Sequence, residues 1–134
     1  MKRIRKEKGQ SLTELALVLP IMLIILAGLL DLGRLYYAYV SISDAAAEGA
    51  AYAAINPTDD TEIATRTQTA SNGLVQVDPG LVNIDCPTVA VGAPVTVTVG
   101  YEFTVATPLI NAMVPGGVLT LRAVATEAIL SGEM

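Results

Sequence analysis

The chain contains no histidine, a single cysteine and only three basic residues beyond its first eight positions. It has no Gly-rich phosphate loop and no Cys/His spacing suited to zinc. Its acidic side chains lack a suitable base or metal partner, and such groups are most often solvated surface. These absences argue against an enzyme. We expect no catalytic residue, no cofactor, no metal and no small-molecule substrate.

Charge is distributed very unevenly along the chain. The first eight residues carry five basic groups and one acid, whereas residues 32–134 carry three basic and ten acidic groups. An acidic body argues against nucleic acid as a partner, because phosphate binding requires clustered Lys and Arg. Basic residues next to a membrane span stay in the cytoplasm. The basic tail therefore predicts a cytoplasmic N-terminus and a translocated, extracytoplasmic C-terminal body.

An uncharged run of 16 residues, Leu15–Leu30, follows this tail. Together with Gln10–Glu14 it would form a helix of about 31 Å, which matches a hydrocarbon core of about 30 Å. A cleavable secretory signal is the alternative, but residues 25–28 place a large side chain at the −3 position of each cleavage site. We expect a single-pass anchor in the cytoplasmic membrane over residues 10–30.

Three residues in this segment need an explanation. Pro20 removes an amide from the helix and loosens or bends it, either for packing among other helices or as the ordinary proline content of membrane helices. Gly28 is a second interruption of the run. Glu14 lies at membrane depth, where a carboxylate costs roughly 3 kcal/mol on insertion scales. It either snorkels to the headgroups or meets a compensating cation.

Residues 31–56 predict an amphipathic helical stalk, which Asn56-Pro57 ends. At 100° per residue, one face carries Leu32, Leu35, Tyr36, Tyr39, Ser43, Ala46, Ala50 and Ala53. The face ends in alanine, so a partner can approach closely there. The other face carries Arg34, Ser41, Asp44, Glu48 and Tyr52.

Three tyrosines, Tyr36, Tyr37 and Tyr39, follow the predicted span at headgroup height. They are consistent with an aromatic belt at the membrane interface. Core packing of Tyr36 and Tyr39 is the competing interpretation.

Residues 57–134 predict the extracytoplasmic α+β domain. Asp59 with Glu62 resembles a capping box, and a short helix follows that uses Ile63, Ala64, Thr67, Ala70 and Leu74 and closes at Asn72-Gly73. Beyond residue 80 the period becomes two, with strands over 95–104 and 119–126 and a shorter one over Val82–Cys86. We expect the inward pattern of the last strand to end before Glu127, and one helical turn over Leu109–Val114. The class is α+β, a long N-terminal helix packed on a small antiparallel sheet.

Cys86 has no partner within the chain for a disulfide. The favoured interpretation is a small buried thiol on a strand, because free cysteine is often buried. An intermolecular bridge in an oxidising compartment is the alternative.

Gly9 followed by a polar residue, with Glu14 five places on and an apolar run after it, resembles a type IV prepilin leader. The resemblance implies that a membrane-embedded prepilin peptidase removes residues 1–9 and leaves Gln10 as the mature N-terminus. It also implies that Glu14 pairs in lipid with the free amine of Gln10, its own or a neighbour's. The physics agrees, because an opposite charge compensates a buried carboxylate.

Two longer strings, 9–20 and 28–37, and the alanine-rich stretch 47–54 resemble the TadE-like family, minor pseudopilins of the Flp/Tad (tight adherence) pilus. The resemblance implies a pilin-like fold, a role in cell adhesion, and pilins or pseudopilins of the same system as partners. Major Flp pilins are shorter and carry a Glu-Tyr pair at the start of the span. This chain has Glu14-Leu15 there, which resembles a minor component more closely. In the family, basic residues flank a Glu-Gly pair. In this chain the pair is Glu48-Gly49, and the flanking residues are the alanines Ala47, Ala50 and Ala51.

Two functions from different classes therefore stand. The first is a pseudopilin-like subunit needed to assemble a Flp/Tad-type pilus, located in the membrane or in the pilus itself. The second is a membrane-anchored extracytoplasmic binding module that is neither processed nor assembled. Glu14 separates them, because a simple anchor has no need of a carboxylate at that depth.

Overall fold

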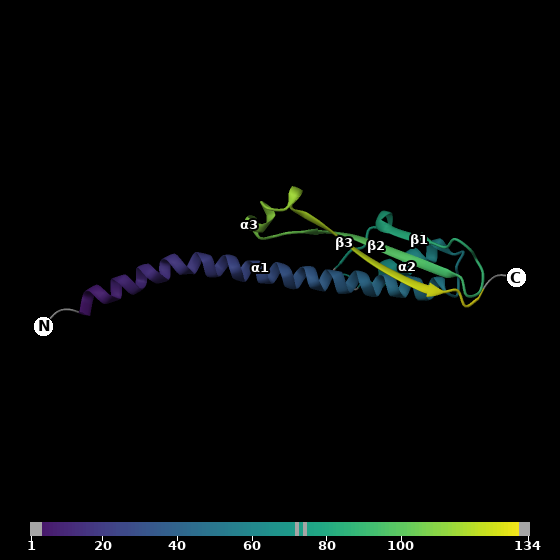
Figure 1. Cartoon of the computed structure of the whole chain (residues 1–134), viewed down its shortest axis with the longest axis horizontal. Helices are drawn as coiled ribbons and strands as arrows, with labels where there is room; N and C mark the ends of the chain where they lie inside the picture. Colours follow the sequence, from purple (N-terminus) through teal and green to yellow (C-terminus); the bar gives the residue numbers. More distant parts are fainter. Residues whose placement is uncertain (1–3, 72, 74, 132–134) are drawn as a thin grey trace.

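The computed structural model describes residues 4–71, 73 and 75–131. Its elements, in chain order, are α1 (Ile4–Ala53), α2 (Asp60–Ala70), the 3-10 turn η1 (Pro79–Leu81), β1 (Val82–Asp85), β2 (Pro94–Thr104), α3 (Pro108–Asn111), the 3-10 turn η2 (Pro115–Gly117) and β3 (Val118–Ala128). Figure 1 shows that the C-terminal half of α1 lies along the sheet, while its N-terminal half projects beyond it. The predicted α+β class, a long helix on a small antiparallel sheet, is confirmed.

Helix α1 is one continuous element of 50 residues, or about 75 Å. It begins at Ile4, before the predicted start of the span at Gln10, and it continues through Pro20. Figure 1 shows the helix curving gently in its N-terminal half. Proline therefore bends the helix at most, because the amide that it removes is one of many in so long an element.

The sheet has the order β1-β2-β3, and both pairs are antiparallel. The predicted alternation in β2 is confirmed, since Val95, Val97 and Val99 are fully buried. In β3, Ala123 is buried opposite Val99, whereas Glu127 is exposed, so the inward pattern ends there although the strand runs to Ala128.

Strand β1 ends at Asp85, which leaves Cys86 just outside it. The prediction of a strand over Val82–Cys86 is therefore one residue too long. The Cys86 side chain is half-buried at the edge of the core, and its thiol lies 3.8 Å from the Thr88 carbonyl oxygen. The polar contact of this thiol is thus local, two residues along the chain.

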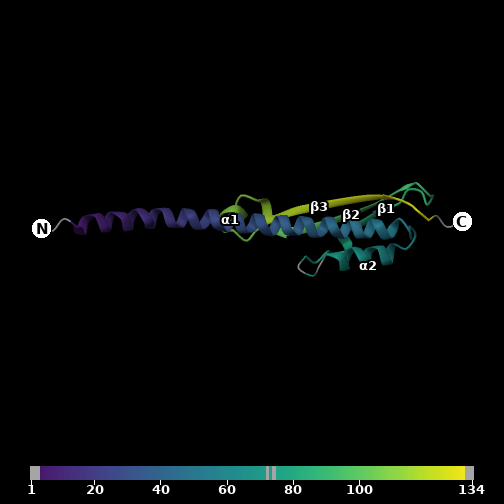
Figure 2. The ribbon, with the colours of Figure 1, turned by 90° about the horizontal axis from the view of Figure 1, so that it is seen from below.

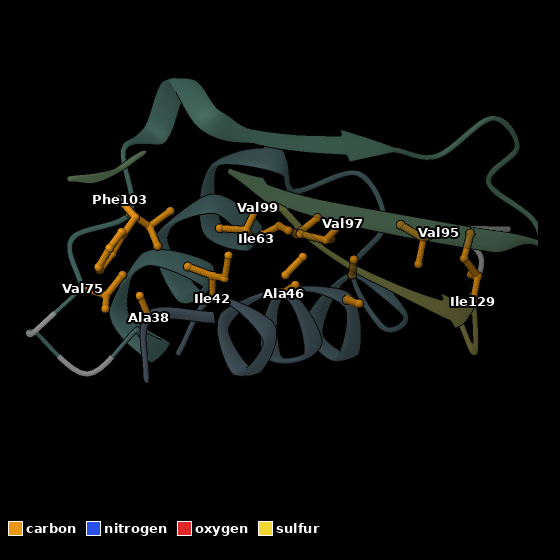
Figure 3. Packing of buried hydrophobic residues seen from close by; sticks show 14 of the residues in the cluster. Ala38, Ile42, Ala46, Ile63, Val75, Val95, Val97, Val99, Phe103 and Ile129 are labelled. Carbon is orange, nitrogen blue, oxygen red and sulfur yellow. The ribbon is translucent and has the colours of Figure 1, made fainter. Parts of the chain in front are cut away.

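Helix α1 packs against the inner face of the sheet, and α2 packs mainly against α1 on the side away from β3 (Figure 2). Ile42 of α1, Ile63 of α2 and the inward valines of β2 meet in one core (Figure 3). Burial of each such side chain contributes about 1.5–3 kcal/mol. Small residues line the contact on both sides, alanines on α1 and Ala123 and Ala125 on β3, so the helix and the strand approach closely.

The buried face of the stalk is rotated from the predicted one. Leu32, Tyr36 and Tyr39 are exposed, whereas Ser41, predicted on the outer face, is buried. The face instead consists of Ala38, Ser41, Ile42, Ala45, Ala46, Gly49, Ala50 and Ala53. The prediction followed the bulkiest side chains, but of these only Leu35 packs partly against the core. Where the sheet does cover it, the residues are small and hydropathy distinguishes one face poorly from another.

The predicted start of α2 is confirmed at its N-cap. The Asp59 carboxylate accepts a hydrogen bond from the Glu62 backbone amide at 3.1 Å. Glu62 also pairs with Arg66, whose guanidinium lies 4.4 Å from the centre of the Tyr52 ring on α1. The sequence predicts closure of the helix at Asn72-Gly73, with a contact by Leu74. Residues 72 and 74 lie outside the described residues, and Gly73 has a φ of +72°.

Gly49 generates a stability prediction, because a Cβ there would overlap the Thr67 hydroxyl oxygen and lie 3.3 Å from Val97 Cγ1. Both neighbours are fully buried, so neither can move aside. We expect Gly49→Ala to lower the free energy of unfolding by about 1–2 kcal/mol, the overpacking cost less the helical gain of alanine. Urea unfolding of the detergent-solubilised full chain, followed by circular dichroism, measures this.

Gly33 is the matched control on the same helix, since nothing lies within 4 Å of its Cβ position. Gly33→Ala should be neutral or stabilise by up to about 1 kcal/mol. Equal effects of the two substitutions would contradict the close contact at Gly49.

Candidate functional site: the N-terminal helix and its junction with the body

The first candidate site is the turn of α1 around Glu14. The Gln10 side-chain amide donates a hydrogen bond to the Glu14 carboxylate at 3.2 Å, and the Thr13 hydroxyl donates to the Gly9 carbonyl oxygen at 2.9 Å. Gly9, Gln10 and Glu14 are all exposed. Glu14 therefore lies one helical turn after Gln10, on the same face of α1.

The second feature is the apolar half of α1. The large side chains from Leu15 to Leu30 are exposed, from 44% at Ile24 to 70% at Leu17. A soluble surface rarely carries so large a contiguous apolar patch. By length and composition α1 is able to cross a membrane, and it is a candidate membrane span.

Gly28 is a point of contact within this half. A Cβ at Gly28 would lie 3.3 Å from the Cδ1 atom of Ile110, in α3. The missing side chain thus lets the connection between β2 and β3 approach the apolar helix. The sequence marks Gly28 only as an interruption and gives no sign of this partner.

The tyrosines after the span do not lie in the core. Tyr36, Tyr37 and Tyr39 are 68%, 44% and 48% exposed. Core packing of Tyr36 and Tyr39 is therefore wrong, because both side chains lie off the face of α1 that Ala38 and Ile42 pack into the core. The interfacial aromatic belt stays a prediction.

The junction between the apolar half of α1 and the body is built on Asp31. Its carboxylate is only 7% exposed and accepts hydrogen bonds from the backbone amides of Thr107, at 2.7 Å, and Ala106, at 3.4 Å. Arg34 Nη1 donates to the same carboxylate at 2.9 Å. Hydrogen bonds from the Thr107 side chain and backbone, then from Ala106 and Arg34, hold the pKa of Asp31 below its usual range.

Arg34 extends this junction to the sheet. Its guanidinium lies 5.4 Å from the centre of the Phe103 ring, near the end of β2. Sequence reasoning missed the junction, although an acid directly after an uncharged run with Arg three residues on was a visible signal. The loop amides that bind Asp31 are 75 and 76 residues away and carry no sequence pattern.

Metal-binding groups are not gathered in the described part of the chain. Across residues 4–71, 73 and 75–131, no three His, Cys, Asp or Glu side chains lie together so as to hold an ion.

The geometry defines an α+β protein whose long helix is half core and half uncovered apolar surface. Residues 9–51 match the family model described as TadE-like protein, which confirms the resemblance seen in the sequence. The match covers about a third of the chain, all of it in α1. The matched segment lies in α1, which is also the candidate membrane span. No curated protein and no solved structure shows significant similarity to the chain.

Asp31→Asn tests the junction. The amide has one acceptor oxygen and no charge, so we expect weaker binding of the loop and lower hydrogen-exchange protection at Ala106 and Thr107. In the unsubstituted protein the contribution of Asp31 is fully present above the ordinary aspartate pKa of 3.8 and is lost as the pH falls through the lower folded-state pKa. In Asp31→Asn the protection factors should not change over that acidic range.

Asp44→Asn is the control, because Asp44 is an exposed acid on the same helix. It should leave the protection of the two loop amides and its pH dependence unchanged. Protection that is independent of pH in the unsubstituted chain would rule out the carboxylate as the loop's anchor.

Proposed function

We propose that this protein is a pseudopilin-like subunit needed for assembly of a Flp/Tad-type pilus. It is anchored in the cytoplasmic membrane by residues 10–30, with its N-terminus in the cytoplasm and its acidic body outside the membrane. Prepilin peptidase removes residues 1–9, and the mature subunit packs against other pilins or pseudopilins of the same system. The role is structural and not enzymatic.

The observation that carries this proposal is the apolar half of α1. Within the segment that matches the TadE-like model, the large side chains before Asp31 are exposed, and the sheet covers only the part beyond it. Such a surface requires lipid or other helices around it, and a pilin-type assembly supplies both in turn.

Glu14 supports processing through an energetic argument. A carboxylate at the centre of a membrane helix costs roughly 3 kcal/mol on insertion scales, which sets the upper bound for Glu14, near the start of the span. Cutting after Gly9 creates an ammonium on Gln10, one helical turn before Glu14, where the Gln10 side chain already reaches the carboxylate. Two opposite charges about 4 Å apart attract by about 4 kcal/mol at an effective dielectric of 20. The new amine, on the same chain or a neighbour, thus offsets the cost of the acid.

Gly9→Val tests processing. A branched side chain at the cut site should block the peptidase, so the protein extracted from membranes should keep Met1–Gly9. Intact-mass measurement distinguishes this chain from a mature one beginning at Gln10. Gly33→Val is the control, the same change on the same helix at a position with nothing within 4 Å of its Cβ. It should be cut normally, and an unprocessed native chain would favour the binding module instead.

Glu14→Gln tests the assembly charge. Loss of the ion pair should reduce recovery of the subunit with its companion pilins, and surface pilus formation, by roughly tenfold or more. Glu14→Asp keeps the charge and should restore a large part of both. Asp44→Asn, at an exposed acid in the C-terminal half of α1, should have no effect. Normal piliation of the Glu14→Gln strain would overturn the assembly role.

A further inference from the structure

The connection between β2 and β3 reaches back along α1, past the end of the sheet (Figure 1). Its helical turn, α3, faces the apolar half of α1 across a groove of about 530 Å³. The groove is lined by Leu23, Ile24, Ala27, Thr107, Pro108 and Ala112. One side of this groove is therefore surface that the proposed function places in lipid.

The depth of this contact follows from helix geometry. Leu23 and Ala27 precede Leu30, the end of the predicted span, by seven and three residues. At 1.5 Å per residue, the loop thus lies about 5–10 Å inside the span. Interfacial elements bury their apolar faces to about the same depth, 5–10 Å, at the boundary between headgroups and acyl chains.

The composition of the connection fits that depth. No charged residue occurs from Phe103 to Leu121, and this stretch is flanked by Glu102 within β2 and Arg122 within β3. Met113, just after α3, is 80% exposed, and its neighbours Ala112 and Pro115 are also exposed. The tip of the loop therefore presents apolar side chains that the body does not cover.

Backbone groups in the connection are largely bonded within the protein. The amides of Ala106 and Thr107 donate to Asp31, and those of Asn111, Ala112 and Met113 donate to carbonyls of the same loop. The Val105 amide donates to the Gly117 carbonyl and closes the base of the loop. Backbone groups paired within the protein lower the cost of placing the loop at the boundary between headgroups and acyl chains, where an unpaired amide would be costly to bury.

We propose that residues 105–117 form a membrane-inserted loop that contacts lipid in the leaflet on the side of the body. The inference rests on the proposed membrane span of α1 and adds a second, reversible point of attachment. Lipid is the occupant because the apolar tip is continuous with the exposed apolar side chains of α1 and lies at the same depth. The Asp31 bonds hold the loop against the helix, so the tip is presented at a fixed height.

Fluorescent probes on single cysteines test the proposal. In a Cys86→Ser background, Met113→Cys, Ile21→Cys and Val91→Cys each carry an environment-sensitive dye. The three positions are all largely exposed, at 80%, 59% and 70%, so labelling should not disturb the fold. Each purified full-length chain is reconstituted at low density into vesicles of phosphatidylethanolamine and phosphatidylglycerol. Iodide in the buffer and a doxyl group near the lipid headgroups serve as the two quenchers.

The probe at Met113 should emit at shorter wavelength than the probe at Val91. Its iodide quenching should be severalfold weaker, and the doxyl lipid should quench it. Ile21 reports the span itself and should also be protected from iodide. A Met113 probe that behaves like the Val91 probe, while Ile21 remains in lipid, overturns the loop proposal alone.

An Ile21 probe open to iodide would overturn the span and the loop together. Protection of Met113 that arises only when other membrane proteins are reconstituted with the chain would assign the tip to a protein partner, and so would overturn lipid as the occupant.

Discussion

The close contact between the sheet and the small-residue half of α1 positions the other parts of this molecule. Gly49 meets Thr67 and Val97 with no room for a side chain, and alanines on α1 lie against the alanine-bearing strand β3. Because this contact fixes the sheet along the helix axis, it also fixes where β2 and β3 end. The connection between them consequently extends beyond the core and meets α1 at Gly28 and Asp31.

One helix thus serves two environments with two kinds of sequence. Its N-terminal half is rich in leucine and isoleucine, which suit a medium that accepts apolar surface without a shaped partner. Its C-terminal half is rich in alanine, which suits a partner that must come close. The change occurs around Asp31, where a buried carboxylate with bonded partners separates the two halves.

Much of this arrangement could be predicted from the sequence because its signals are local. The alternation in β2, the Asp59 cap and the string around Gly9 and Glu14 are all contained in short windows. The buried face of the stalk was not predictable, since alanines surround that helix and only the position of the sheet selects among them. The bonds from Thr107 to Asp31 were not predictable either, because they depend on how two distant segments align once the sheet is paired.

The proposed functions occupy different levels of the same helix. The charge pair at Gln10 and Glu14 concerns the cytoplasmic end, and the apolar loop concerns the opposite membrane surface. Between them lies an uncovered segment that is free to exchange lipid for neighbouring helices. A subunit of this kind can move from the bilayer into the proposed assembly without refolding of its body.

The continuity of α1 has a mechanical consequence. No turn or glycine pair separates the uncovered half from the half that carries the sheet, and the loop at Asp31 and Gly28 ties the two halves together a second time. Torque applied to the helix by its neighbours is therefore transmitted to the body as a whole. The orientation of the sheet is therefore set by the contacts that neighbouring molecules make with the uncovered N-terminal half of α1.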